Sequence, residues 1–200
     1  MATISKTQGT AILAHTAITH PDSVYGSAQD VSTKLAATII CFHASVEAAA
    51  NTNAGSFYVQ VSGAGSNDED WATIAQFTAT VSTANTEAMT ATEPIGEVVL
   101  ACASTTGFVA NDYIYIQNST LANGEWAQVD KIVTNVSVDL VSGLTNEQTS
   151  SSVLWDDADI FVCQLDLTAV GRVRVLFKHE GAAGANCHVK ALMVTGDSIA

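Results

Sequence analysis

The sequence has little positive charge and no long apolar run. Seven basic residues stand against twenty acidic ones, which gives a formal net charge of −13 at pH 7. A field of that sign repels phosphate backbones and anionic lipids, so we expect no nucleic-acid partner and no membrane partner. Residues 1–20 have neither a basic start nor a continuous apolar segment, and no other stretch approaches the length of a membrane span. The sequence therefore predicts a protein made in a cytoplasm.

Cysteine is also scarce, and its four copies are isolated from one another. Cys41, Cys102, Cys163 and Cys187 each lie in an apolar segment, and none belongs to a CxxC pair. A free cysteine packs as a small hydrophobic residue, so we interpret the four as buried thiols. A disulfide or a metal site is the alternative.

Apolar residues with helical spacing are missing, whereas alternation with a period of two recurs along the chain. In residues 56–62, Phe57, Val59 and Val61 share one face, as in a half-buried antiparallel strand. Residues 34–46 are apolar on both faces and are expected to lie centrally in a sheet. Alternation of the same kind is found in residues 71–81, 160–168, 172–178 and 187–194. The sequence predicts an all-β protein.

We expect three parts along the chain. Residues 31–94 and 156–200 together supply enough strands for a jelly-roll-like antiparallel β-sandwich, although neither half could close one alone. Residues 95–155 hold five short strand segments separated by turn signals, which is typical of a small SH3-like or OB-like β-barrel inserted into a sandwich loop. Residues 1–30 are too polar for a core strand throughout, so we expect an N-terminal arm that is ordered only against a neighbour. The predicted barrel core consists of Phe108, Ile114, Ile116, Trp126, Val129, Ile132, Val138, Leu140 and Leu144.

Residues that could bind a metal are few and scattered. Cys41 and His43 lie two apart on one predicted strand, so they share a face and could begin a metal site. We favour a buried thiol beside a hydrogen-bonded histidine, because no second ligand pair is near in the sequence. Cys187 and His188 should point to opposite faces of a strand. The remaining histidines are expected to be exposed or at strand ends: His15, His20 and His179.

Two acidic segments and a set of aromatic residues suggest weaker binding hypotheses. Residues 66–71 and 155–159 could offer oxygens to Ca²⁺, but the first lacks the acid spacing and the terminal Glu of an EF-hand. Aromatic residues could line a sugar-binding platform, although such residues are more often part of a core. These are Trp71, Trp126, Trp155, Tyr113 and Tyr115. We expect no catalytic residues, no cofactor and no bound metal, and we expect that the protein is not an enzyme.

The segment STTGFVANDYIYIQN, followed by GEWAQVDKIVTNVSVDLVSGLT, resembles small β-barrel modules in structural proteins of tailed bacteriophages. The resemblance covers residues 95–155 and rests on turn and core positions, among them the turn at Gly107 and Phe108. The flanking segments, residues 57–77 and 172–194, look like the jelly-roll or sandwich strands of phage capsid decoration proteins. Such families have no catalytic residues, so the resemblance implies none here.

The resemblance implies a virion structural protein, namely a capsid decoration (cement) protein that binds the outer capsid surface and stabilises the shell through protein–protein contacts. The implied partners are the major capsid protein, other virion proteins and further copies of the chain in a homo-oligomer. The implied location is the virion. A tail, baseplate or fibre protein and a carbohydrate-binding or adhesin module are the alternatives. The strong acidity suits the outside of a shell that is filled with DNA.

Overall fold

The protein is all-β, as the alternation of its side chains predicts. The computed structural model describes residues 4–6, 9–19, 21–46, 55–63, 70–79, 84–179 and 186–199. Sixteen strands run through these residues, each antiparallel to its neighbours, and the short 3₁₀ turn η2 (Leu121–Asn123) precedes β11. No α-helix is found in this part of the chain, and none of its helical turns could cross a membrane.

The first sheet has the strand order β1-β16-β5-β14, and β2 pairs with β16 as well. Its strands are β1 (Ile4–Lys6), β2 (Thr10–Thr19), β5 (Ala36–Ser45), β14 (Ala158–Asp166) and β16 (Asn186–Ile199). The apolar strand β5 lies between β16 and β14, in the central place that its two apolar faces predict. Both chain ends belong to this sheet, because Ile4 pairs with Ile199.

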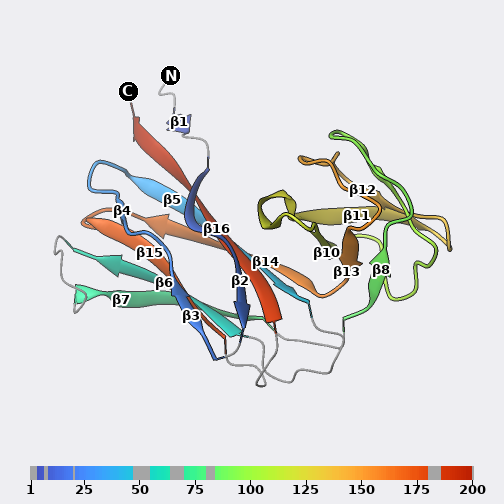
Figure 1. Ribbon diagram of the computed structural model, residues 1–200. Helices are drawn as coiled ribbons and strands as arrows, with labels where there is room; N and C mark the ends of the chain where they lie inside the picture. The colour runs from blue at the N-terminus through green and yellow to red at the C-terminus, as the bar shows by residue number, and fades with distance from the viewer. Residues whose placement is uncertain are drawn as a thin grey trace.

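The second sheet packs face to face on the first and completes a jelly-roll-like sandwich (Figure 1). It has the order β3-β15-β6-β7, with β4 also paired to β15. Its strands are β3 (Ser23–Tyr25), β4 (Gln29–Asp30), β6 (Gly55–Ser62), β7 (Ala72–Ala79) and β15 (Arg172–His179). The inner faces supply one core, which includes Ile39, Cys41, Phe57, Val59, Leu165, Val173, Val175, Phe177, Cys187 and Val189. The predicted inward residues of each alternating segment contribute to this core or pack against it.

A third, strongly curved sheet forms the barrel, with the order β8-β13-β10-β11-β12-β9. Its strands are β8 (Thr86–Ala88), β9 (Val99–Ala101), β10 (Tyr113–Gln117), β11 (Glu125–Val133), β12 (Ser137–Leu140) and β13 (Val153–Trp155). A bridge between Met89 and Cys102 joins the two ends of this order. The barrel has its own core, which contains every predicted residue except Trp126, although Ile132 is only partly buried.

The chain enters and leaves the barrel at one point. Thr86 pairs with Trp155, and the Asp156 carboxylate accepts hydrogen bonds of 2.6 Å from the main-chain and side-chain nitrogens of Asn85. Strand β8 therefore precedes the boundary at residue 95 that the sequence suggests. Alternation could not reveal β8, because it is only three residues long and has no apolar face of its own.

Residues 10–30 differ from the expected N-terminal arm. Strand β2 pairs with β16 from Thr10 to Thr19, and its side chains Ile12, Leu13 and Ile18 are part of the sandwich core. The apolar residues of β2 do not alternate regularly, because its pairing with β16 shifts register near Ala191. Because its apolar residues do not alternate, the sequence of β2 does not show the pattern of a core strand. The short strands β3 and β4 then cover the edge of β15.

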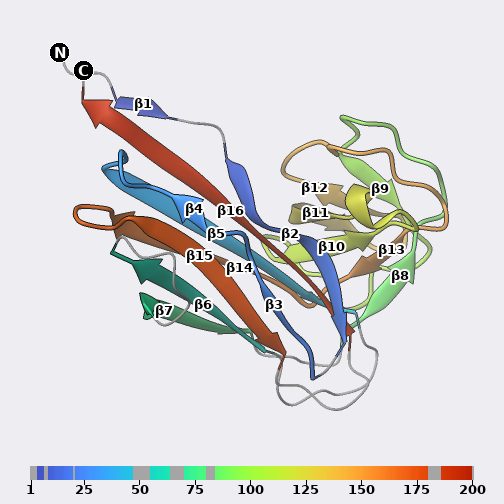
Figure 2. The same cartoon turned by 60° about the vertical axis from the view of Figure 1, so that its left-hand side comes forward.

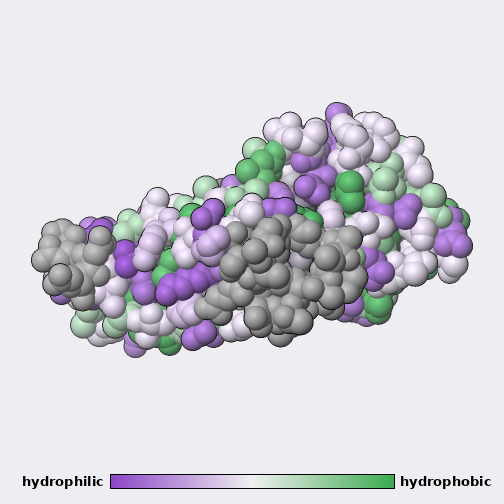
Figure 3. Space-filling model, turned by 60° about the horizontal axis from the view of Figure 1, so that its bottom comes forward, coloured by the Kyte–Doolittle hydropathy of each residue, from purple (hydrophilic) through white to green (hydrophobic). Residues whose placement is uncertain are grey.

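The barrel lies beside one end of the sandwich, and the chain termini lie at the opposite end (Figures 1 and 2). On the face shown in Figure 3, hydrophobic residues form small scattered patches among hydrophilic ones.

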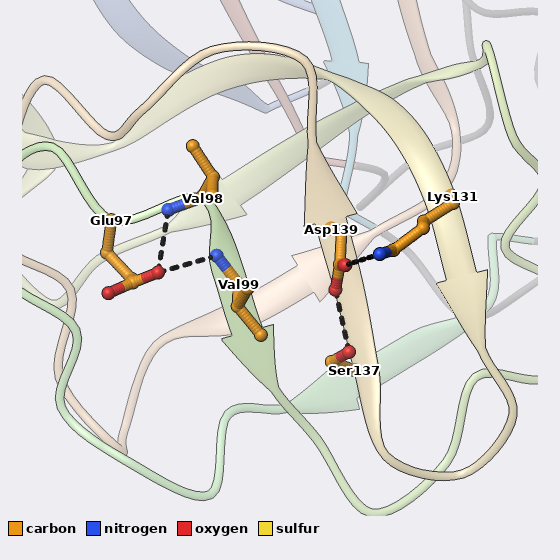
Figure 4. Close-up of polar contacts among 6 residues, drawn as sticks. All are labelled: Glu97, Val98, Val99, Lys131, Ser137 and Asp139. Atoms are coloured by element: carbon orange, nitrogen blue, oxygen red, sulfur yellow. Dashed lines mark hydrogen bonds and ion pairs between the residues drawn. The ribbon is translucent and has the colours of Figure 1, made fainter.

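At the start of β9 a side chain caps the backbone. Glu97 Oε1 accepts hydrogen bonds from the main-chain nitrogens of Val98 and Val99 (Figure 4). On the next strand, Asp139 pairs with Lys131 and accepts a hydrogen bond from Ser137.

Candidate functional site between the sandwich and the barrel

The outer face of the first sheet carries the side chains that meet the barrel. Along β16, Cys187 and Val189 point into the sandwich core, so His188 points outward, as the predicted opposite faces of Cys187 and His188 require. Strand β2 brings His15 beside His188, and β5 presents Phe42 to the barrel. Three neighbouring strands of the first sheet thus place two histidines and an aromatic ring on one surface.

Tyr115 meets these histidines from the barrel. Its phenol oxygen lies 3.1 Å from His15 Nε2 and 3.0 Å from His188 Nδ1, and the two histidine nitrogens are 3.1 Å apart. Tyr115 and His188 are buried, and His15 is half-buried. Gly124 makes this position possible, because a Cβ at residue 124 would overlap the Tyr115 hydroxyl. Three polar atoms from distant parts of the chain therefore converge at the contact.

Trp126 belongs to the same contact with the sandwich, and it is therefore absent from the barrel core. Its ring lies 4.7 Å from the Tyr115 ring and 5.0 Å from the His15 ring, measured between centroids. Its indole nitrogen donates a hydrogen bond of 2.9 Å to the main-chain carbonyl of His43. Strand β11 thus turns Trp126 away from the barrel interior and toward the sandwich.

A pocket of about 230 Å³ opens beside this cluster. Trp126, His15 and Phe42 form its aromatic wall, and Glu125 and Lys190 bring one charge of each sign to it. The Glu125 carboxylate is held by Thr145 and Gln148, which donate hydrogen bonds to its two oxygens. The pocket gives solvent a route to the edge of the histidine cluster.

The ionisable groups of the cluster are uncharged at neutral pH. Burial, with help from nearby His188 and Lys190, lowers the pKa of His15 to about 4, and burial alone lowers the pKa of His188 to about 4. Burial raises the pKa of the Tyr115 phenol. Both imidazoles therefore keep a lone pair, and the phenol keeps its proton.

The pair Cys41 and His43 shares the inner face of β5, as predicted, and neither side chain is exposed. Burial, with a contribution from Cys163, raises the pKa of Cys41 to about 12, so the thiol stays protonated. The predicted hydrogen bond of His43 is wrong for the described residues, because neither of its ring nitrogens has a partner among them. Burial, together with His179 and His188, lowers the pKa of His43 to about 3.

The four cysteines are free thiols. Burial is confirmed for Cys41, Cys102 and Cys187, whereas Cys163 on the outer strand β14 is only half-buried. No three His, Cys, Asp or Glu side chains converge in a way that could hold a metal within the described ranges. The expectation of no bound metal at such residues stays a prediction.

The two acidic segments differ in what the structure describes. Most of residues 66–71 lies outside the described residues. In residues 155–159, the Asp156 carboxylate is occupied by Asn85, and burial raises the pKa of Asp159. Among the described residues of this segment, no group of three acidic, histidine or cysteine side chains is placed to hold a cation.

The aromatic residues of the proposed sugar platform are separated. Trp126 and Tyr115 face the sandwich, whereas the Trp155 indole donates a 2.8 Å hydrogen bond to Gln117 within the barrel. Trp71 lies on the outer face of the second sheet, where the Arg174 guanidinium stacks 4.2 Å from its ring centroid. The tryptophans therefore do not form one flat face.

The outer face of the second sheet collects positive charge in a strongly acidic chain. Arg172, Arg174 and Lys178 alternate along β15, as the sequence predicts, and they are three of the seven basic residues. Arg174 also stacks on Tyr25, and Lys178 stacks on Tyr58. Cation–π contacts of this kind hold the charges close to the sheet.

Sequence reasoning did not find the cluster of His15, Tyr115 and His188. One expectation about it was wrong, because His15 lies within a strand and is half-buried. Tyr115 is buried, as the interpretation of these aromatic rings as core residues predicts. His179, by contrast, is at a strand end, and His20 is outside the described residues. The three cluster residues are far apart in the sequence and lie in two different parts of the fold. Only the docking of the barrel on the first sheet brings them together.

Comparisons with known proteins show only weak structural similarity to viral proteins. No protein-family model matches the chain, and no curated protein matches it. Among solved structures, VP17, a capsid protein of bacteriophage P23-77, matches with a TM-score of 0.19 and 9% identity over 98% of this chain and 100% of that chain. A structure of infectious bursal disease virus, Gx strain, matches with a TM-score of 0.24 and 9% identity over 99% of this chain and 83% of that chain. TM-scores below 0.5 do not establish a common fold.

Proposed function

We propose that this protein is a virion structural protein, specifically a capsid decoration (cement) protein that binds the outer capsid surface. In this role it adds protein–protein contacts between neighbouring capsid subunits and so stabilises the shell. Its proposed partners are the major capsid protein and further copies of the chain. The resemblance of residues 95–155 to small β-barrel modules in structural proteins of tailed bacteriophages supports this role.

An exposed apolar surface on the barrel carries the proposal. Ile95 and Val141 are 69% and 54% exposed, and Val98 and Val99 are also exposed. Residues 95–99 run beside residues 139–144, because Leu140 N donates to Val98 O and Gly96 N donates to Leu144 O. We call Ile95, Val98, Val99 and Val141 the barrel patch. Exposed apolar side chains on adjacent segments of this kind suit burial against another protein.

The attachment of the barrel to the sandwich also supports a structural role. Burial of Tyr115 and the hydrogen bond from Trp126 to His43 hold the two parts together. A contact made by the barrel patch is then transmitted to the whole sandwich. The net charge of −13 repels the packaged genome and so favours a position outside the shell.

Rebinding to shells that have been stripped of this protein tests the proposal. The purified protein should bind such shells and raise the temperature at which they release DNA. Ile95→Asp and Val141→Asp should each weaken binding at least tenfold, because each would bury a carboxylate without a partner. Val162→Asp is the matched control, since Val162 is an equally exposed valine on β14 of the sandwich.

Copy number separates a decoration protein from a tail protein. Quantitative mass spectrometry of purified heads and tails should find hundreds of copies in the head fraction. A handful of copies confined to the tail would contradict the decoration role. Unchanged rebinding of both barrel-patch variants would contradict the assignment of the contact surface.

A further inference from the structure

Three polar atoms from three strands meet between the sandwich and the barrel. His15 Nε2 on β2, His188 Nδ1 on β16 and Tyr115 Oη on β10 lie 3.0 to 3.1 Å from one another. Hydrogen bonds can use only two of these three contacts at once, because each inward imidazole nitrogen either carries a proton or offers a lone pair, and the phenol has one proton. A cation that accepts a lone pair from each atom would use all three.

The spacing of the three atoms fits a transition-metal ion. An ion about 2.1 Å from each atom, the usual bond length to imidazole nitrogen, sits just above the plane of the three atoms. With the observed contacts, the angles between its bonds are about 95°. Angles near 90° occupy one triangular face of an octahedral or tetragonal site, whereas a tetrahedral site needs its ligands farther apart.

The surroundings of the three atoms also suit a bound cation. Imidazole nitrogens such as those of His15 and His188 are common ligands of transition-metal ions in proteins. The neighbouring pocket is lined by His15, so solvent can reach the cluster from that side. Lys190 adds a positive charge there, but Glu125 lines the same pocket and offsets it. The chain needs no movement of its backbone to present these ligands.

We propose that His15, His188 and Tyr115 form a binding site for a divalent transition-metal ion, with Cu²⁺ as the preferred ion. Imidazole ligands suit copper, nickel and zinc, and sites built from nitrogen and oxygen bind Cu²⁺ most tightly in this series. The metal displaces the phenol proton and binds the phenolate oxygen. Because the ligands come from both the barrel and the first sheet, the ion ties the two parts together. This site is independent of the proposed role in the virion.

Copper titration of the purified full-length protein tests the site directly. Addition of CuSO₄ should quench the tryptophan fluorescence with one equivalent bound, since Trp126 lies 5.0 Å from the His15 ring. Coordination of Tyr115 should produce a visible phenolate-to-copper charge-transfer band, and the bound ion should raise the Tm. Addition of ZnSO₄ should remove the band only at an excess over copper.

A matched pair of variants identifies the ligand. Tyr115→Phe keeps the ring but removes the oxygen, so it should abolish the charge-transfer band and weaken copper binding at least tenfold. Tyr113→Phe, two residues away on the same strand, should leave both unchanged. His188→Gln should also weaken binding at least tenfold, and circular dichroism checks that each variant is folded.

Two results would overturn the proposal. One is a wild-type protein that retains no copper after dialysis or shows no charge-transfer band. The other is equal copper affinity in wild type and in folded Tyr115→Phe. The presence or absence of the charge-transfer band in the wild-type protein tests the proposal even if a variant fails to fold. In either case the three side chains would only hydrogen-bond across the contact.

Discussion

The Trp126 indole nitrogen donates a 2.9 Å hydrogen bond to the main-chain carbonyl of His43. This bond crosses from the barrel to the sandwich, and the Trp126 ring packs 5.5 Å from Phe42 on the same strand as His43, measured between centroids. A single side chain therefore joins the two parts by a polar and an apolar contact. The relative position of barrel and sandwich depends on it.

Replacing Trp126 by Phe should loosen the contact while leaving each part folded. The change leaves the His43 carbonyl without this donor, and we expect a loss of about 1–3 kcal/mol in the free energy of unfolding. Limited proteolysis should then cut first at the two crossings near Asn85 and Asp156. Trp155→Phe is the control, because its indole bonds to Gln117 inside the barrel. Equal cleavage at the crossings in both variants would contradict the prediction.

Gln148 is a buried polar side chain whose hydrogen-bonding groups are all used. Its amide nitrogen donates to Asn123 O and Glu125 Oε1, and its amide oxygen accepts from Asn118 and Ser152. Gln148→Leu would leave these partners unsatisfied in the barrel and should cost about 2–4 kcal/mol. Urea unfolding measures this cost. The exposed neighbour Glu147→Ala should change stability by less than about 0.5 kcal/mol, and a similar loss in both variants would count against the network.

Gly124 should not tolerate a side chain. A Cβ there would overlap the Tyr115 hydroxyl, so Gly124→Ala must push the phenol away from His15 and His188. We expect a loss of about 1–3 kcal/mol from overpacking, measured as a lower Tm. Gly63→Ala is the matched control, because a Cβ at residue 63 meets nothing within 4 Å. A Tm of Gly124→Ala equal to that of the control would show that the phenol moves at no cost.

The alternation of side chains was sufficient to predict the fold class, and particular strands show why. Val173, Val175 and Phe177 form one face of β15 and are fully buried in the core between the sheets. Because one face of such a strand is buried, the alternation of apolar and polar residues indicates directly which side chains point into the core. All five predicted barrel segments are strands for the same reason. The boundaries assigned to the parts stay predictions.

The candidate site could not be predicted in this way. His15, Tyr115 and His188 each point to the side of their strand that faces away from its own core, where a polar or amphipathic residue is ordinary. They become buried only because one sheet docks on another, and alternation within a strand contains no information about docking. Trp126 is different, because it lies three residues from the inward Val129 and alternation along β11 places it on the opposite face. That face is covered by the sandwich.

The buried histidine His43 should control part of the stability at acidic pH. Its ring nitrogens have no hydrogen-bond partner among the described residues, and its pKa is lowered from 6.5 to about 3. The unfolded chain therefore binds a proton at this residue below pH 6.5 that the folded protein does not bind. His43 therefore has no effect on the pH dependence of stability above pH 6.5, and it lowers the free energy of unfolding progressively as the pH falls from 6.5 toward 3.

His43→Leu removes this titration and replaces a polar ring by an apolar side chain of similar size. At pH 7 the variant should be more stable by about 1 kcal/mol, because it buries no unpartnered nitrogen. Between pH 5.5 and pH 4 its free energy of unfolding should fall less steeply, by about 1.4 kcal/mol per pH unit. Urea unfolding over this pH range measures both effects. Identical slopes for the two proteins would mean that His43 takes up a proton in the folded state as readily as in the unfolded chain.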